Sequence, residues 1–336
     1  MTATQSAGIR SAESPRWGTV LLTGATGFVG GHLLPRLGET GFDVRCATRD
    51  LARAASAHPD CTWVRLDVND RATLVPALSG VRAVVYLVHG MGGDSGYERR
   101  ELDAAHALVE EAARAGAERI VYLGGVAPRG RPSRHLRSRL ATGEALRSGT
   151  VPVFELRAAM VVGHGSTSWQ IVRDLATRLP AMILPRWLST RSRPIGIDDV
   201  VFGLETALTL PVADAGLYEL PGPEVLSAKD ILLRIARLRG TRPVTLSVPI
   251  LTPRLSSYWL KLVTAADYDV ARELVEGLRS DLLPTGRPFW DLVPDHDLVP
   301  FDEAARRALA ADQETLPTSV ALVEEGIARL SRRTRR

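Results

Sequence analysis

Short runs of β-branched residues alternate with longer stretches of helical periodicity between residue 18 and about residue 162. This alternation is typical of βαβ units, in which a helix follows each strand of a parallel sheet. The pattern predicts helices at 27–38, 70–78, 97–115 and 133–147. It predicts strands at 19–23, 43–48, 62–67, 83–88, 119–124 and 151–162. The first half is therefore expected to be an α/β Rossmann domain with a doubly wound parallel sheet.

The strict alternation ends after Gly163, where proline-rich connections appear. The sequence there predicts one strand at 244–248 and helices at 198–208, 228–239, 255–263 and 269–278. We expect a smaller mixed lobe that is interleaved with the Rossmann sheet and forms the substrate pocket. The predicted organisation is a flexible N-terminus (1–16), a Rossmann domain (17–163), a substrate lobe (164–320) and a basic tail (321–336).

Composition limits the possible environments and partners. The longest apolar runs are far shorter than the roughly 20 residues that span a bilayer, and residues 1–15 lack the apolar stretch of a secretory signal. We expect a cytoplasmic protein with no membrane contact. The net charge of +4 comes from arginines interleaved with acidic residues, so no nucleic-acid partner is predicted. Cys46 and Cys61 lie in no CxxC or His/Cys cluster, which favours free buried thiols and no metal.

The strongest motif is TGATGFVG at residues 23–30, directly after an apolar strand and at the start of a helix. Gly24 permits a tight turn, Gly27 lets the backbone approach a pyrophosphate, and Gly30 allows close packing of helix on strand. The free N–H groups and the dipole of the helix start favour phosphate oxygens. The motif predicts that a dinucleotide cofactor is bound by Gly24, Thr26, Gly27, Phe28, Val29 and Gly30.

The ends of the next strands indicate which cofactor is bound. Arg49 ends the second strand, where an arginine accepts a ribose 2′-phosphate and an acidic residue would repel it, so NADP(H) is favoured. Asp50 and a purely surface role for Arg49 leave this choice open. Asp67 and Val68 are expected to hold the adenine. The run Leu87, Val88 and His89 is expected to pass under the nicotinamide ribose.

The motif at 23–30, Arg49-Asp50, the run 66–68 and the strand 119–124 resemble those of atypical and extended short-chain dehydrogenases/reductases, the NAD(P)H-binding, NmrA-like and epimerase-like branch. The resemblance covers about residues 18–310. In that family a serine after the fifth strand and a Tyr-x-x-x-Lys on the next helix usually supply acid/base chemistry. Here Gly124-Gly125 stand where the serine would be, and HLRSRL (135–140) stands where the tyrosine and lysine would be.

Loss of this apparatus slows a reductase without forbidding it, because general acid help is worth about 10²- to 10⁴-fold on top of a well-placed hydride donor. The departure resembles that of atypical ketoreductases that tailor aromatic polyketides, such as simocyclinone-type angucyclinone reductases. This likeness implies a flat polycyclic ketone as substrate and a role in antibiotic biosynthesis.

Three residues are candidate proton donors: Ser95 and Tyr97 beyond the fourth strand, and His135 near the missing tyrosine. Ser95 has the alternative role of a helix N-cap, since Glu98 follows three residues later, and His135 that of a solvated basic face. Substrate contacts are predicted from Met160, His164, Trp169 and Trp187, with packing between the lobes as the alternative.

The leading hypothesis is an NADPH-dependent ketoreductase that acts on a small-molecule ketone. The alternative is a non-catalytic NADP(H)-binding regulator that senses redox state, and a sugar epimerase or dehydratase is a third reading. The sequence does not specify the oligomeric state.

Overall fold

The computed structural model describes residues 17–89, 96–178, 181–241, 243–248 and 280–315. Its main sheet has seven strands, all parallel, in the order β11-β6-β5-β4-β1-β2-β3. The strands are β1 (Thr19–Leu22), β2 (Asp43–Thr48), β3 (Thr62–Arg65), β4 (Ala83–Tyr86), β5 (Arg119–Gly125), β6 (Val153–Ala158) and β11 (Gly216–Leu220). From β1 the chain first adds β2 and β3 on one side, and then β4, β5 and β6 on the other side. The boundary between β1 and β4 is therefore the switch point where α/β sheets bind ligands.

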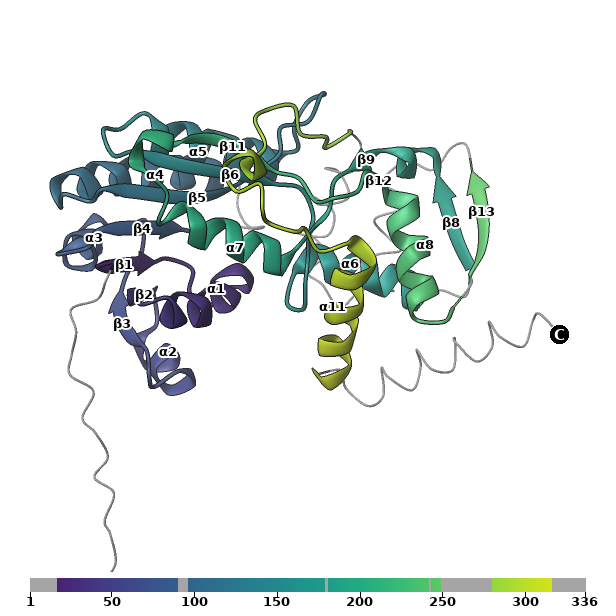
Figure 1. The fold of residues 1–336 in the computed structure, drawn as a ribbon, viewed down its shortest axis with the longest axis horizontal. Coiled ribbons are helices and arrows are strands. Elements are labelled where there is room, and N and C mark those ends of the chain that lie inside the picture. Colours follow the sequence, from purple (N-terminus) through teal and green to yellow (C-terminus); the bar gives the residue numbers. More distant parts are fainter. Residues whose placement is uncertain (1–16, 90–95, 179–180, 242, 249–279, 316–336) are drawn as a thin grey trace, which may run out of the picture.

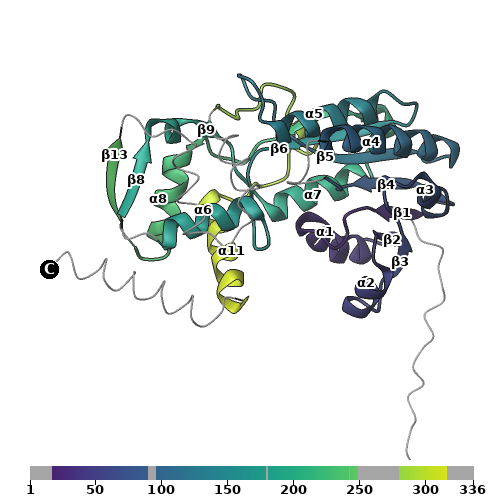
Figure 2. The ribbon, with the colours of Figure 1, turned by 180° about the vertical axis from the view of Figure 1, so that it is seen from behind.

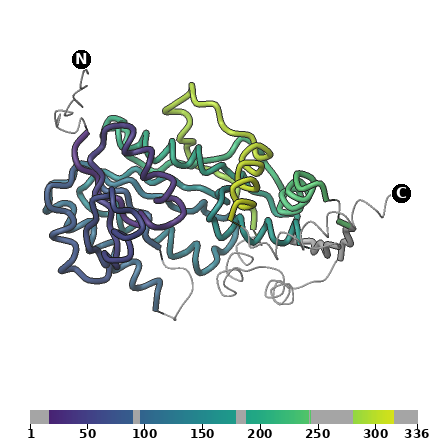
Figure 3. The backbone as a smooth tube through the Cα atoms, turned by 90° about the horizontal axis from the view of Figure 1, so that it is seen from below, coloured from purple at the N-terminus to yellow at the C-terminus, as the bar shows by residue number. Residues whose placement is uncertain are grey.

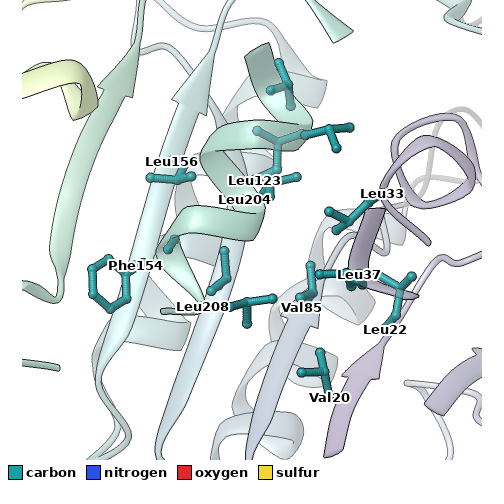
Figure 4. Close-up of a cluster of buried hydrophobic side chains, with 14 of the residues drawn as sticks. Val20, Leu22, Leu33, Leu37, Val85, Leu123, Phe154, Leu156, Leu204 and Leu208 are labelled. Carbon is teal, nitrogen blue, oxygen red and sulfur yellow. The ribbon is translucent and has the colours of Figure 1, made fainter. Parts of the chain in front are cut away.

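Helices cover both faces of this sheet (Figures 1 and 2). They are α1 (Phe28–Glu39), α2 (Leu51–Ala57), α3 (Arg71–Leu78), α4 (Tyr97–Arg114), α5 (Arg134–Arg147) and α7 (Ile197–Ala207). One core joins α1 and α7 to the sheet, with Leu33 and Leu37 of α1 over Val85 of β4 and with Leu204 of α7 near Leu156 of β6 (Figure 4). A second core joins α3, α4 and α5 to the opposite face. Burial on both faces explains why the strands read as continuous apolar runs.

A second lobe follows at the other end of the molecule (Figure 3). Its helices are α6 (Thr167–Thr177), α8 (Ala228–Leu238) and α11 (Phe301–Thr315), with the short 3₁₀ helix η1 (Arg186–Ser189) on a connection. Two other 3₁₀ helices, η2 (Val212–Asp214) and η3 (Phe289–Leu292), lie beside β11 of the main sheet. The strands of the second lobe form pairs: β7 (Val161–Val162) with β10 (Ile195–Gly196), β8 (Ala181–Pro185) with β13 (Val244–Val248), and β9 (Arg191–Ser192) with β12 (Leu226–Ser227). A separate core of α6, α8 and α11 holds this lobe together.

The predicted α/β Rossmann class is confirmed, and the second half contributes to it. The seventh strand, β11, and helix α7 come from beyond residue 163 and pack on the sheet of the first half. The single strand predicted at 151–162 divides into β6 and β7, because the chain leaves the sheet at 159–160. Helices α2, α6 and α11 and strand β11 were not predicted. The helices predicted at 255–263 and 269–278 lie outside the described residues.

The two cysteines differ in their burial. Cys46 in β2 is fully buried, whereas Cys61 is only partly buried, and both are free thiols. Burial, with the nearby Cys61, raises the pKa of the Cys46 thiol to about 12. Cys46 is thus a neutral packing group. Within the described ranges, no helix combines the length and the apolar composition that crossing a membrane requires.

Candidate active site

A cleft of about 1280 Å³ lies at the carboxyl edge of the main sheet. Its walls come from the β1–α1 turn, the ends of β2 to β5, the starts of α4 and α5, and the segment 158–172 of the second lobe. The cleft brings together all the residues predicted to hold the cofactor, which are Gly24, Thr26, Gly27, Phe28, Val29, Gly30, Arg49, Asp67, Val68, Leu87, Val88 and His89.

The β1–α1 turn is built for close contact with a ligand. Gly24 has φ +67°, a left-handed conformation that side chains rarely adopt. A Cβ at Gly30 would lie 2.2 Å from the carbonyl oxygen of Gly24, so helix and turn touch through backbone atoms. Gly27 is the N-cap of α1, and its exposed backbone leaves the first N–H groups of the helix open to the cleft. This cradle fits a pyrophosphate.

The turn is fastened to the end of β4 by a buried threonine. The Thr23 hydroxyl donates to the Val85 carbonyl at 3.1 Å and accepts from the Leu87 N–H at 3.0 Å. The backbone at Leu87 therefore borders the glycine turn, and Val88 and His89 continue from it along the cleft.

The end of β2 places a cation and an acid, Arg49 and Asp50, side by side on the wall of the cleft. Arg49 is exposed and lines the cleft. The Asp50 carboxylate caps α2 by accepting the Arg53 N–H at 3.1 Å, so it is already used within the protein. Arg53 also lines the cleft and was not predicted, although its position four residues after Arg49 was a signal for it.

The end of β3 carries the predicted adenine contacts, Asp67 and Val68, and both line the cleft. One carboxylate oxygen of Asp67 accepts the backbone N–H of Asn69 at 3.0 Å and its side-chain amide at 3.3 Å. The Asp67 N–H donates to the Thr73 hydroxyl at 3.0 Å. These bonds fix the loop after β3 in shape.

At the end of β5, packed side chains replace the serine of the usual scheme. A Cβ at Gly125 would lie 2.6 Å from Cδ1 of Leu136 and 3.6 Å from Nε of Arg139. A Cβ at Gly124 would lie 3.1 Å from Oε1 of Glu155. A Cβ at either glycine would therefore press on a neighbouring side chain, so a serine at these positions would need the neighbours to move.

Two histidines face each other across this part of the cleft. The rings of His89, after β4, and His135, in the first turn of α5, have centroids 5.7 Å apart. Burial and the Arg139 charge lower the pKa of His135 to about 4. The His89 side chain is exposed to the open cleft. Its pKa is nevertheless lowered to about 3, first by the protein packed around it and then by the charge of Arg139 and by His135. Both imidazoles are neutral at pH 7, and each can donate one N–H.

The predicted proton donors Tyr97 and His135 both line the cleft, and an ion-pair cluster joins the helices that carry them. Tyr97 begins α4 and is buried, with the Arg134 guanidinium 4.4 Å from its ring centroid. Glu98 pairs with Arg134 at 3.0 Å and with Arg137 at 3.2 Å. The third predicted donor, Ser95, lies outside the described residues. The capping role considered for Ser95 lies outside the described residues as well, and α4 follows Gly96.

The second lobe supplies a mostly apolar wall. Met160, one of the predicted substrate contacts, lines the cleft. Val161, Ile171, Val172 and Leu282 also line the cleft, and Val126 and Leu136 of the Rossmann domain add apolar surface to it. Thr167 and Ser168, at the start of α6, add hydroxyl groups that were not predicted.

The structure places two other predicted substrate contacts away from this wall. Trp169 is 1% exposed in the core of the second lobe, and its indole N–H donates to Oδ2 of Asp312 at 2.8 Å. His164 lies 2.6 Å from the other oxygen of Asp312, through Nδ1. Both side chains tie α11 to the α6 region, because Asp312 offers two acceptors there. Trp187 lies in η1, and its side chain is outside the described part.

Among the described residues, no group of three or more His, Cys, Asp or Glu lies close enough together to hold a metal ion.

Comparison with protein families identifies the cofactor-binding part. Residues 24–174, from the glycine turn into α6, match the family model described as NAD(P)H-binding. Residues 24–174 thus carry an NAD(P)H-binding domain. The domain carries the glycine cradle, Arg49 and the two histidines on one edge of the sheet.

Two curated relatives extend over most of the chain. One is the ceramide reductase of Caulobacter vibrioides, 27% identical over 291 residues, which are 82% of this chain and 89% of the relative. Another is the (4-alkanoyl-5-oxo-2,5-dihydrofuran-3-yl)methyl phosphate reductase of Streptomyces griseus, 27% identical over 297 residues, which are 82% of this chain and 97% of the relative. Both similarities span the two lobes.

Among solved structures, the fold is similar to that of the Citrobacter sp. triphenylmethane reductase in complex with NADP(H). The TM-score is 0.67 at 17% identity, covering 86% of this chain and 99% of that chain. A likeness at this identity shows that the fold is shared.

Proposed function

We propose that this chain is an NADPH-dependent reductase that transfers hydride to the carbonyl carbon of an apolar small molecule without the Ser-Tyr-Lys triad. The observation that carries the proposal is that one cleft is lined by the dinucleotide cradle, by the neutral His135 and by an apolar wall. An apolar pocket with a few convergent polar groups is the usual form of a small-molecule site.

The charges at the end of β2 support NADPH as the donor. Arg49 and Arg53 offer two cations on one side of the cleft, where a ribose 2′-phosphate would accept charge-assisted hydrogen bonds. Asp50, the residue that would favour an unphosphorylated ribose, is held as the cap of α2.

Bound NADPH supplies the hydride, and the chain's own residues position and polarise the acceptor. The neutral His135 N–H donates a hydrogen bond to the carbonyl oxygen, where negative charge develops. Tyr97 is a second candidate donor in the same cleft. His135 keeps its N–H throughout and only holds the hydrogen bond. The alkoxide takes its proton from solvent water at the cleft mouth, and the hydroxide that results is neutralised by the bulk buffer. The apolar wall excludes the remaining water and so strengthens the hydrogen bond.

The wall supports a substrate with a large apolar body. A flat polycyclic ketone of the aromatic polyketide type fits this description, and such a substrate implies a place in antibiotic biosynthesis. The names of the relatives add two other shapes, a ceramide and an alkanoyl-oxo-dihydrofuran methyl phosphate. All three classes belong in the test.

The test is NADPH oxidation, followed by its near-ultraviolet absorbance, with the full-length chain and a panel of polycyclic, long-chain aliphatic and furanone ketones. We expect turnover with at least one class and a 10- to 100-fold loss in kcat for His135→Phe, which keeps the ring volume and removes the N–H. His32→Phe is the matched control, because His32 is exposed on α1 and bonds the Phe28 carbonyl. Tight NADPH binding without oxidation across the panel would contradict the reductase and favour the redox-sensing regulator.

A further inference from the structure

Residues 280–288, here called the crossing segment, run from β9 of the second lobe to β11 of the main sheet (Figure 1). A β-bridge joins Leu282 to Ser192 of β9, and another joins Pro288 to Glu219 of β11. Each bridge fixes the backbone of the segment beside a strand of a different lobe. The segment therefore has a defined path across the molecule.

The first end of the crossing segment is held by backbone hydrogen bonds and by charge. The Leu282 N–H donates to the Arg191 carbonyl at 2.8 Å. The Asp281 carboxylate accepts the Arg191 N–H at 2.7 Å and lies 3.2 Å from the guanidinium of the same arginine. On the Rossmann side, a Cβ at Gly130, in the loop before α5, would lie 2.9 Å from Oγ of Ser280. This end of the segment therefore touches both lobes.

Leu282 is the residue of this end that faces the cleft. It is partly buried and lines the cleft, whereas its neighbours Asp281 and Leu283 are not among the described lining residues. Successive side chains of an extended segment point to opposite sides. The pairing of Asp281 with Arg191 thus leaves Leu282 directed into the cleft. Because the segment joins the two lobes here, the cleft ends against this leucine.

The lining on this side of the cleft is aliphatic. In the described lining that the second lobe and the crossing segment supply, the large apolar side chains are Met160, Val161, Ile171, Val172 and Leu282. The aromatic rings of Phe28, Tyr86 and Tyr97 also line the cleft, but all three come from the Rossmann domain. A flat ring system gains from stacking on aromatic faces, whereas an alkyl chain gains from each methylene group that it buries. The aliphatic lining therefore favours an alkyl chain.

We propose that Leu282 is a specificity-determining residue, which closes the aliphatic side of the cleft and sets the length of the alkyl chain that the substrate carries. The inference rests on the proposed reductase for the reacting carbonyl and on the crossing segment for the position of Leu282. Each methylene that enters the aliphatic lining should raise affinity about fourfold. The gain stops at Leu282, because a further methylene would overlap its side chain.

The test measures ketone binding by calorimetry in the full-length chain loaded with NADP⁺, which carries no hydride to transfer. The probes are straight-chain methyl ketones from hexanone to tetradecanone, with fluorenone as a flat ketone. In the unsubstituted protein, affinity should rise about fourfold per methylene up to one chain length and then stop rising. Leu282→Ala should move this limit about two methylenes longer, because the lost isobutyl group leaves room for them. Leu282→Phe should move the limit to a shorter chain.

Leu283→Ala is the matched control, because it makes the same change in the next residue, which is also partly buried but is not among the described lining residues. Its chain-length limit should equal that of the unsubstituted protein. If Leu282→Ala does not fold, Leu282→Val replaces it, with a smaller shift in the same direction. In an active reductase the limit should appear in KM, with kcat nearly unchanged, since the contact is the same in the ground state and the transition state.

Three results would overturn the inference: no binding of any methyl ketone, the same limit in the alanine and phenylalanine variants as in the unsubstituted protein, or fluorenone binding more tightly than every methyl ketone. The last result would assign the cleft to flat rings. A limit that shifts as expected, in a chain that oxidises NADPH with none of the ketones, would support the role of Leu282 and contradict the reductase proposal alone.

Discussion

The β1–α1 turn and the start of α5 lie on the same cleft, yet they contribute to it in different ways. In the turn, backbone N–H groups make the site, and Gly24 and Gly30 are required because any Cβ would strike backbone or strain the turn. At the start of α5, side chains make the site, and a Cβ at Gly125 would press on the end of the Leu136 side chain, which would have to move. A site made of backbone tolerates no substitution of its glycines, whereas a site made of side chains can exchange one chemistry for another.

The largest effect is expected at Gly30, where the backbone contact is closest. In Gly30→Val the new Cβ meets the Gly24 carbonyl oxygen at 2.2 Å, so the turn must open and NADPH affinity should fall by about 100-fold or more. Calorimetric titration with NADPH measures this. Gly31→Ala is the matched control, because a Cβ there meets nothing within 4 Å. Equal affinities of the two variants would show that the turn does not bind the pyrophosphate.

A smaller effect is expected at Arg49, where a side chain adds to the backbone site. Charge-assisted hydrogen bonds are worth about 1.5–3 kcal/mol each, so Arg49→Gln should weaken NADPH binding by about 10- to 100-fold and leave NADH binding nearly unchanged. Competition binding with both cofactors measures the ratio. Arg45→Gln is the control on the same strand, since Arg45 donates to the carbonyls of Ala77 and Ser79 and does not line the cleft. A parallel loss for NADH would contradict 2′-phosphate recognition.

The packing of side chains at the start of α5 is tested most directly at Gly125. Restoring the serine of the usual scheme, Gly125→Ser, places a Cβ 2.6 Å from Leu136, and overpacking of this kind costs about 1–3 kcal/mol. We therefore expect a lower free energy of unfolding and lower turnover, measured by chemical denaturation and NADPH oxidation. Gly116→Ala also adds a methyl group but meets nothing within 4 Å, so its cost should reflect only its positive φ. Higher turnover in Gly125→Ser would mean that the site lacks the serine without other residues having taken over its role.

The difference between backbone and side-chain parts of the cleft also explains which features could be predicted from the sequence. The glycine turn, Arg49 and the alternating pattern are local, so they predicted the Rossmann class and the cofactor cleft. The seventh strand, β11, was missed because its place depends on pairing with β6, about sixty residues earlier in the chain. The roles of Leu282 and of Asp50 needed contacts of the folded chain, with β9 and with the start of α2. Trp169 was expected at the substrate wall because aromatic residues suit flat ligands, but its indole is used in the second core.

The smallest effect on the cleft is expected at Trp169, which tests whether that second core is separate from the substrate wall. Trp169→Phe removes the N–H bond to Asp312 and should cost about 1–3 kcal/mol of stability, since the buried Oδ2 of Asp312 then keeps only its 3.5 Å contact with Arg173. The KM for the ketone should stay within about twofold of the original value, because ring packing in the core is largely kept.

Met160→Ala is the opposite case, because Met160 lines the cleft and is only partly buried. It should raise KM by about 10-fold, the loss of roughly 1–2 kcal/mol of apolar contact, with a smaller effect on unfolding. A raised KM in Trp169→Phe with unchanged stability would mean that Trp169 contacts the substrate. The core of the second lobe would then contribute side chains to ligand binding, as the start of α5 does.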